Sequence, residues 1–242
     1  AFQGSVVVGM GFVLDGAAAS EMIKSDVKNA DVVFPYLSGD DINSQTDQRP
    51  SRSIICFWDW SEERATKYQE PYRWIEERVK PERQRRDERG SFALRKPLPD
   101  RWWQYGDKRP GLYHAIGRGE RFEVHPKEWV SGKPAETVFA CSLHSKHLGI
   151  ARLPSDWVYS HGCAVFVTES MSAFSLLSSS INEAWTRKNS SSLGATLRYV
   201  ITDAFETLPL ISFYDSVLEE IGTRYEQHRT CLGSKIGIGL TD

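Results

Sequence analysis

The stretch TVFACSLHSKHLGIARLPSDWVYSHGCAVFV, residues 137–167, decides the fold class of this chain. It contains three short apolar runs, at residues 137–141, 148–152 and 163–167, with polar and turn-forming residues between them. Runs of this length, bounded in this way, are typical of β-strands. We therefore expect three strands in this part of the chain.

Other strands and helices are expected on both sides of this stretch. Helical spacing of apolar residues occurs at 17–29, 71–79, 172–187 and 212–230, and Ser61 is expected to cap a further short helix. Because strands and helices alternate irregularly, the sequence predicts an α/β chain of the mixed α+β kind, with an irregular mixed sheet, flanking helices and a C-terminal helical segment. The further strands are expected at 5–9, 12–14, 32–34, 53–58, 112–116, 121–125 and 196–201.

Loop composition divides the chain further. Pro35 is expected to end the strand at 32–34, and the polar residues at 36–50 indicate an exposed loop. The segment 97–110, rich in proline and tryptophan, is interpreted as a link. We expect three regions, which are an N-terminal α/β half at 1–110, a strand-rich base-reading half at 111–210 and the C-terminal helical segment at 211–242.

Composition excludes several classes of protein. Of the 242 residues, 40% are hydrophobic and 26% are charged, which are ordinary values for a globular protein. The longest apolar stretch, residues 6–14, is much shorter than the about 20 residues of a membrane span, so no membrane partner is expected. No secretory leader follows Ala1, and none of the four cysteines forms a C-x-x-C pair. Reduced thiols and a cytoplasmic location are therefore expected.

The charge of the chain is unevenly distributed. The net charge is −2, yet residues 80–109 hold ten Lys or Arg against five Asp or Glu. A local basic face determines which polyanions a protein attracts, so the near-neutral total leaves an anionic partner open.

The sequence lacks the common catalytic motifs, but it contains one cluster of cysteine and histidine residues that could bind a metal ion. There is no P-loop, no G-x-S-x-G and no H-E-x-x-H, and no N-P-P-Y tetrapeptide that would hold a target amine. Cys141, His144 and His147 have the spacing C-x-x-H-x-x-H, with His161 and Cys163 downstream. Zinc accepts such ligands, but the usual tight pairs at each end are absent. We assign no catalytic residue and no metal ligand, and keep a metal-dependent enzyme as an alternative.

A set of short motifs, taken in order, resembles a known family. The set resembles the target-recognition region of MmeI-like enzymes, which are large single-chain type IIG restriction-modification methyltransferases with relatives in phage defence. The resemblance covers nearly the whole chain. The motifs are FQGS (2–5), GMGF (9–12), VFPYL (33–37), GDD (39–41), SRSI (51–54), VKPER (79–83), WW (102–103), RP (109–110), SK (145–146), LLSS (176–179), AW (184–185), LRY (197–199) and FETLP (205–209).

The resemblance implies a function and a division of labour. Members of the family methylate the exocyclic amine of adenine with S-adenosylmethionine, in a catalytic domain upstream of the recognition region. The resemblance therefore implies that this chain recognises double-stranded DNA, holds no cofactor itself and works with an upstream methyltransferase domain of the same parent chain.

The resemblance also implies a set of DNA-contacting residues. Aligned on Arg198 and Tyr199, the positions that commonly set specificity fall at Gly194 and Thr196. Glycine allows the backbone to approach a base closely, and threonine offers a hydroxyl and a methyl group. Family members often carry a charged pair there, so the alternative that these residues only form a turn stays open. The candidates for phosphate contacts are Lys146, Arg152, Lys188 and Arg198.

A third interpretation uses the basic segment. Residues 80–109 have the charge to bind an acidic protein surface, which would make the chain a protein-interaction module of a defence complex.

Overall fold

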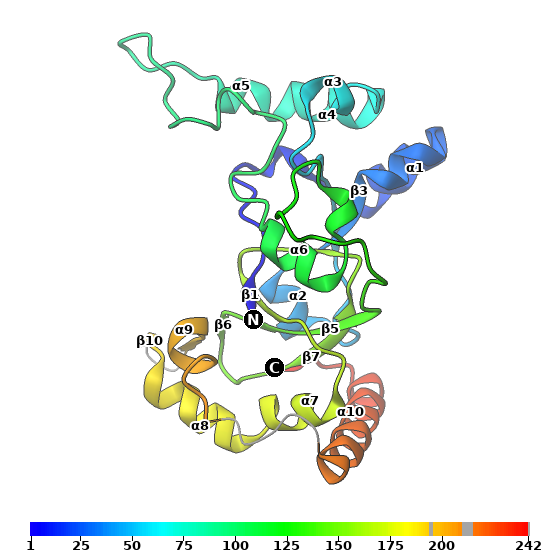
Figure 1. Cartoon of the computed structure of the whole chain (residues 1–242), viewed down its shortest axis with the longest axis vertical. Helices are drawn as coiled ribbons and strands as arrows, with labels where there is room; N and C mark the ends of the chain where they lie inside the picture. The colour runs from blue at the N-terminus through cyan, green and yellow to red at the C-terminus, as the bar shows by residue number, and fades with distance from the viewer. Residues whose placement is uncertain (194–195, 210–214, 242) are drawn as a thin grey trace.

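The computed structural model describes residues 1–193, 196–209 and 215–241, whose strands form three small sheets (Figure 1). The first sheet has the order β1-β9-β5-β7, and all neighbouring strands in it are antiparallel. Its strands are β1 (Phe2–Gln3), β9 (Cys163–Phe166), β5 (Thr137–Ser142) and β7 (Ala151–Pro154).

Two other sheets complete the strand framework. The second sheet has the order β2-β4-β3-β8, in which only the β3–β8 pair is parallel. The third has the order β10-β11-β6 and is antiparallel throughout. The strands are β2 (Val13–Leu14), β4 (Arg52–Ile55), β3 (Val33–Leu37), β8 (Val158–Tyr159), β10 (Ser192–Leu193), β11 (Thr196–Arg198) and β6 (His144–Ser145).

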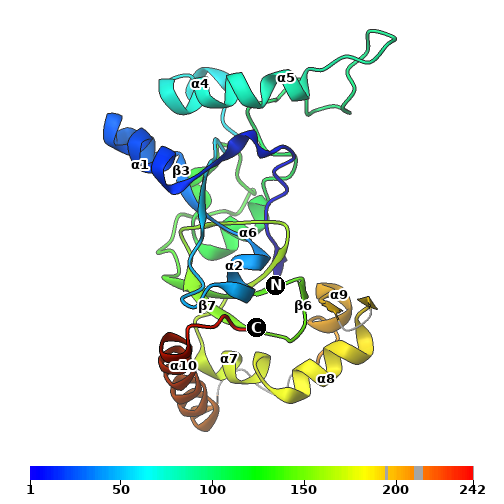
Figure 2. The same ribbon diagram turned by 180° about the vertical axis from the view of Figure 1, so that it is seen from behind.

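Helices lie at both ends of the elongated molecule, whereas α2 and α6 lie beside the sheets in its middle part (Figures 1 and 2). The helices α3, α4 and α5 lie at one end of the long axis, α7 to α10 lie at the other, and the sheets lie between them. This confirms the predicted mixed α+β class with a C-terminal helix. The helices are α1 (Gly16–Ser25), α2 (Gly39–Ser44), α3 (Glu62–Ala65), α4 (Gln69–Arg78), α5 (Lys80–Arg83), α6 (Pro110–Ile116), α7 (Met171–Leu177), α8 (Ser180–Asn189), α9 (Ile201–Ala204) and α10 (Ser216–Ile236), with 3-10 turns at Met10–Phe12, Val27–Asp31 and Gly119–Arg121.

Strand β5 is buried on both faces, which explains its unbroken apolar sequence. Successive side chains point to opposite sides of a sheet. Val138 and Ala140 join the main core, whereas Phe139 and Cys141 join a second core formed with α7. There the rings of Phe139 and Phe174 stack with 5.1 Å between their centroids.

Three predicted strands are wrong. Residues 5–9 form no strand and make only isolated bridges, from Ser5 to Ser160 and from Val6 to Asp107. Residues 112–116 form α6, because Pro110 suits the first turn of a helix and Gly117, with φ of 89°, ends it. Residues 121–125 form no strand. Instead the carboxylate of Asp59 accepts hydrogen bonds from the backbone amides of Glu123 (2.8 Å) and Val124 (2.9 Å), which satisfies them without a ladder.

Two other expectations need correction around β3. Pro35 does not end this strand, since its pairing with β8 begins one residue later, at Tyr36, where a backbone amide is present. The polar segment 36–50 contains α2, which begins with a capping box between Ser38 and Asp41.

The expected helix at 172–187 is interrupted at Ser178, and Ser179 then caps α8.

None of the helices in the described part of the chain is both long and apolar enough to span a bilayer.

Candidate nucleic-acid interface

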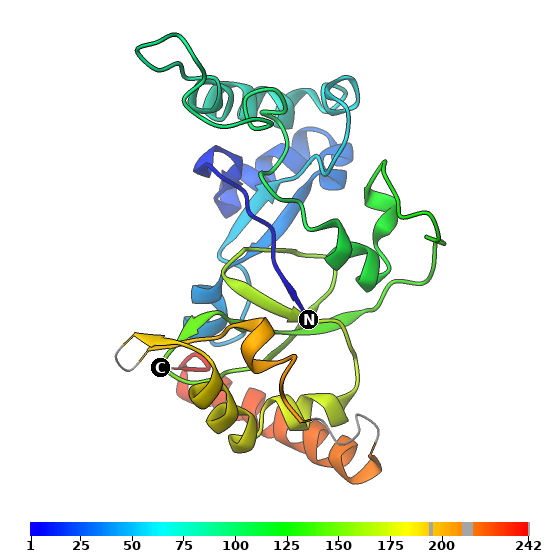
Figure 3. The same cartoon turned by 60° about the vertical axis from the view of Figure 1, so that its left-hand side comes forward.

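The third sheet carries the residues that the sequence placed in a base-reading role. In β11 the side chains alternate, because Thr196 and Arg198 are exposed whereas Leu197 between them is only 2% exposed. Thr196 and Arg198 therefore share one solvent face. Figure 3 shows the β10–β11 hairpin projecting from the body of the molecule. Gly194 lies outside the described residues.

The neighbouring strand β6 adds polar groups to the same face. Its register with β11 pairs Arg198 with His144 and Leu197 with Ser145. His144 is exposed and Ser145 is buried, which matches the alternation of β11. When this register is continued by one residue, exposed Lys146 lies across from Thr196. Cross-strand neighbours have Cβ atoms about 5 Å apart, so these four exposed side chains form one polar patch.

Helix α8 braces the turn that holds Lys146. The guanidinium of Arg187 donates one hydrogen bond to the backbone oxygen of Lys146, at 2.7 Å. It also forms an ion pair of 2.6 Å with Glu183, which lies 3.8 Å from the ring of His147. Lys188 follows Arg187 and is exposed. Arg187 therefore positions the backbone at Lys146, while Lys188 remains open to solvent.

Sequence reasoning missed Arg187. The signal for it was the i,i+4 spacing of Glu183 and Arg187 on a helix, which predicts an ion pair. That spacing gives no indication of the contact with Lys146, which depends on how α8 packs against β6.

The inner face of the third sheet is anchored in the second core. The backbone amide of Tyr199 donates to the oxygen of Leu143 at 2.8 Å, and the Tyr199 ring meets Phe166 edge to face with centroids 6.1 Å apart. Burial raises the pKa of Tyr199 far above its ordinary value, so the phenol stays neutral. The adjacent residues Arg198 and Tyr199 therefore point to opposite sides, one to solvent and one to the core.

Arg152 lies apart from this patch. It is on β7, at the edge of the first sheet, with its Nε 3.3 Å from the hydroxyl of Thr137. It lines an open hollow of about 520 Å³ together with Arg49, Arg52 and Trp157. The structure thus brings Lys146, Lys188, Thr196 and Arg198 into one region, and places Arg152 elsewhere.

The residues of the C-x-x-H-x-x-H cluster are not brought together. The thiols of Cys141 and Cys163 are buried, and burial raises the pKa of Cys163 to about 12. His144, in contrast, is on the exposed face of β6. Among the described residues, no three His, Cys, Asp or Glu side chains converge in a way that could hold a metal ion. The metal-dependent alternative therefore receives no support from the geometry.

Comparisons with known proteins identify a fold but no sequence relative. No model of a known protein family matches this chain, and no curated protein matches its sequence. A solved structure that shares the fold is MmeI, described as a Type IIL restriction-modification enzyme in complex with DNA, with a TM-score of 0.65 and 12% identity. The match covers 95% of this chain and 27% of the MmeI chain, so this chain spans about a quarter of that length. The expected resemblance is confirmed at the level of the fold.

Proposed function

We propose that this chain is a sequence-specific recognition module for double-stranded DNA. The observation that carries the proposal is the exposed patch of Thr196, Arg198, His144 and Lys146 on the projecting third sheet. It is supported by the fold that the chain shares with part of MmeI, whose structure contains DNA.

A β-hairpin is a type of element that can read bases. The major groove of B-DNA is about 12 Å wide and admits a two-stranded β-ribbon. In the proposed complex, the β10–β11 hairpin enters the groove and Thr196 meets a base edge. Its hydroxyl donates or accepts a hydrogen bond, and its methyl group packs against a thymine methyl. Gly194 is proposed to bring the backbone close to the same base pair.

The cations around the hairpin supply affinity rather than specificity. We assign phosphate contacts to Lys146, Lys188 and Arg198 around the patch, and to Arg152 at its separate position. Phosphate contacts fix the position of a protein on the duplex without reading its sequence. Each one steepens the dependence of log K on log salt by about 0.9.

The chemistry lies with a partner domain in this proposal. The module holds the DNA while an upstream domain of the same parent chain binds S-adenosylmethionine and methylates an adenine, in restriction-modification or phage defence. The parent acts in the cytoplasm, and this module contributes no catalytic residue and no cofactor site.

Selection from a library of randomised duplexes tests the assignment. The protein is expected to enrich one short sequence. Replacing Thr196 by Val removes the hydroxyl and keeps the shape, so the preference at one base pair should change while the others persist. Replacing Arg198 by Gln should weaken binding to all sequences alike and lower the salt slope by about 0.9.

Thr202 offers a matched control, because it is an exposed threonine on α9 outside the patch. Thr202→Val should leave both the enriched sequence and the salt slope unchanged. An unmodified protein that binds no duplex, or a Thr196→Val variant with an unaltered preference at every position, would refute the proposal.

A further inference from the structure

A second hairpin, residues 85–93, projects from the opposite end of the molecule beyond α5 (Figures 1 and 2). We call it the basic arm. Its two sides are joined by a bridge between Arg86 and Phe92 and by a 2.8 Å hydrogen bond from the amide of Asp87 to the oxygen of Ser91. The carboxylate of Asp87 caps the turn by accepting from the amides of Arg89 and Ser91, both at 2.9 Å. The arm is therefore a defined turn.

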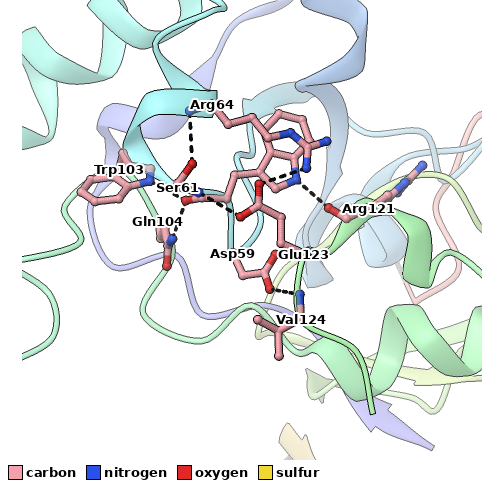
Figure 4. A network of polar contacts seen from close by, with 9 residues as sticks. Asp59, Ser61, Arg64, Trp103, Gln104, Arg121, Glu123 and Val124 are labelled. Carbon is pink, nitrogen blue, oxygen red and sulfur yellow. Dashed lines mark hydrogen bonds and ion pairs between the residues drawn. The ribbon is translucent and has the colours of Figure 1, made fainter. Parts of the chain in front are cut away.

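Hydrogen bonds to the core hold the chain before and after the arm. Before it, the guanidinium of Arg83 donates to the backbone oxygens of Val7 (2.6 Å), Val8 (2.7 Å) and Gln104. After it, the side chains of Trp103 and Gln104 both donate to the oxygen of Trp60, at 2.9 and 2.8 Å (Figure 4). Arg83 thus fixes the chain two residues before the arm, and a 2.9 Å hydrogen bond from the amide of Ala93 to the oxygen of Arg85 closes its base.

The charge that the arm presents to solvent is positive. Arg85 and Arg89 in the arm and Arg95 just beyond it are exposed, and no ion pair involves them in the part of the chain that the structure describes. Arg86 stacks on the Phe92 ring, 4.6 Å from its centroid, and adds a fourth cation. Two acids lie in the same stretch, because the carboxylate of Asp87 is engaged inside the turn and Glu88 is exposed. Residues 85–95 therefore hold four arginines against two acids, a net charge of +2.

The arm and the β10–β11 hairpin project toward the same side of the molecule from opposite ends of its long axis (Figures 1 and 3). We propose that the basic arm binds the phosphate backbone of the same duplex that the hairpin reads, at a distance from the base-reading patch. This inference rests on the proposed function. A duplex is a stiff polyanion that reaches both ends at once, whereas an acidic protein surface on the arm would have no reason to share the side of the hairpin.

Two matched triple variants test the inference. One replaces Arg85, Arg89 and Arg95 by Gln. The control replaces Lys24, Lys28 and Lys235 by Gln, which removes the same charge from exposed positions on and beside α1 and at the end of α10, away from the arm. Binding of a labelled, mixed-sequence duplex of about 30 base pairs is measured by fluorescence anisotropy over a range of salt concentrations.

The arm variant should bind about 10- to 100-fold more weakly at about 0.1 M salt, with a salt slope lower by about 2 to 3. The control should change both quantities much less, and the sequence preference should survive in both variants. If the arm variant binds the duplex like the control, the inference fails while the proposed function stands.

Two other results are distinguishable from that one. An unmodified protein that binds no duplex overturns the proposed function and the inference together. An arm variant that keeps duplex binding but loses binding to labelled poly-glutamate would assign the arm to an acidic protein, and would also overturn the inference.

Discussion

Replacing Arg83 by Met should destabilise the protein by about 3 kcal/mol. The Arg83 side chain is 1% exposed and donates to three backbone oxygens, and among the described residues no carboxylate forms an ion pair with it. Methionine keeps the aliphatic volume but leaves the three acceptors without a donor, at about 2 kcal/mol each. Burial lowers the pKa of Arg83 to about 10, so removing the buried charge stabilises the protein by about 3 kcal/mol and offsets part of this cost. The difference is a net loss of about 3 kcal/mol.

Urea unfolding followed by circular dichroism measures this loss of stability. Thermal unfolding gives a second measurement, and in a protein of this size the Tm should fall by about 10 °C. Arg85 gives the control, since it lies two residues away, is exposed and has no hydrogen bond or ion pair from its side chain among the described residues. Arg85→Met should stay within about 0.5 kcal/mol of the unmodified protein. An Arg83→Met variant as stable as Arg85→Met would show that the three carbonyls find other donors, and the argument for a fixed arm base would lose its support.

The remaining predictions concern one carboxylate and one helix contact. Burial alone would raise the pKa of Asp41, but hydrogen bonds from Ser38 and Ser51 lower this pKa below 3.8. The Asp41 carboxylate therefore stabilises the protein above that pH, and this stabilisation is lost as the pH falls through the folded-state pKa. Asp41→Asn should therefore cost stability at pH 7 and little at about pH 2, whereas the same change at exposed Asp40 should have a small effect at both, as measured by urea unfolding. Gly222→Ala should lower stability by about 1–3 kcal/mol, because the added Cβ would lie 2.1 Å from the backbone oxygen of Met171 where α10 crosses α7. The control Gly233→Ala, whose added Cβ would have its nearest neighbour at 3.7 Å, should be neutral or stabilising. Equal Tm values for the two variants would contradict this prediction.

Strands β5 and β9 of the first sheet were predictable, because a strand that is buried on both faces has an almost continuous apolar sequence. Residues 137–141 and 163–167 are almost wholly apolar, and the structure confirms them as β5 and β9. The run at 112–116 is equally apolar, but it is a helix, and its length does not distinguish the two states. Pro110 and Gly117 were the better signals there.

The candidate site was harder to predict than the fold. Lys146 and Arg198 are far apart in sequence, and β6 and β11, which bring them together, have only two and three residues. Strands this short have no detectable periodicity, so their pairing follows from the tertiary fold. The roles assigned to Gly194, Thr196 and the phosphate-binding residues stay predictions, and Arg152 must reach DNA from a separate surface if its assignment is correct.

Two motifs of the family resemblance serve the core. Arg83, in VKPER, and Trp102, in WW, are both buried, at 1% and 2% exposure. A resemblance based on such residues reports the shared fold more directly than a shared DNA sequence. This agrees with a structural match at 12% identity.

The pairing of early strands with late ones constrains how the protein emerges from the ribosome. Phe2 pairs with Val165, and Tyr36 pairs with Val158, so the two large sheets are complete only when about 160 and 120 further residues have followed these early strands. At about 5–20 residues per second, the first strands wait roughly 10–30 s for their partners. During that interval their edges are open to wrong pairing, so nascent chains should depend on chaperones for their yield.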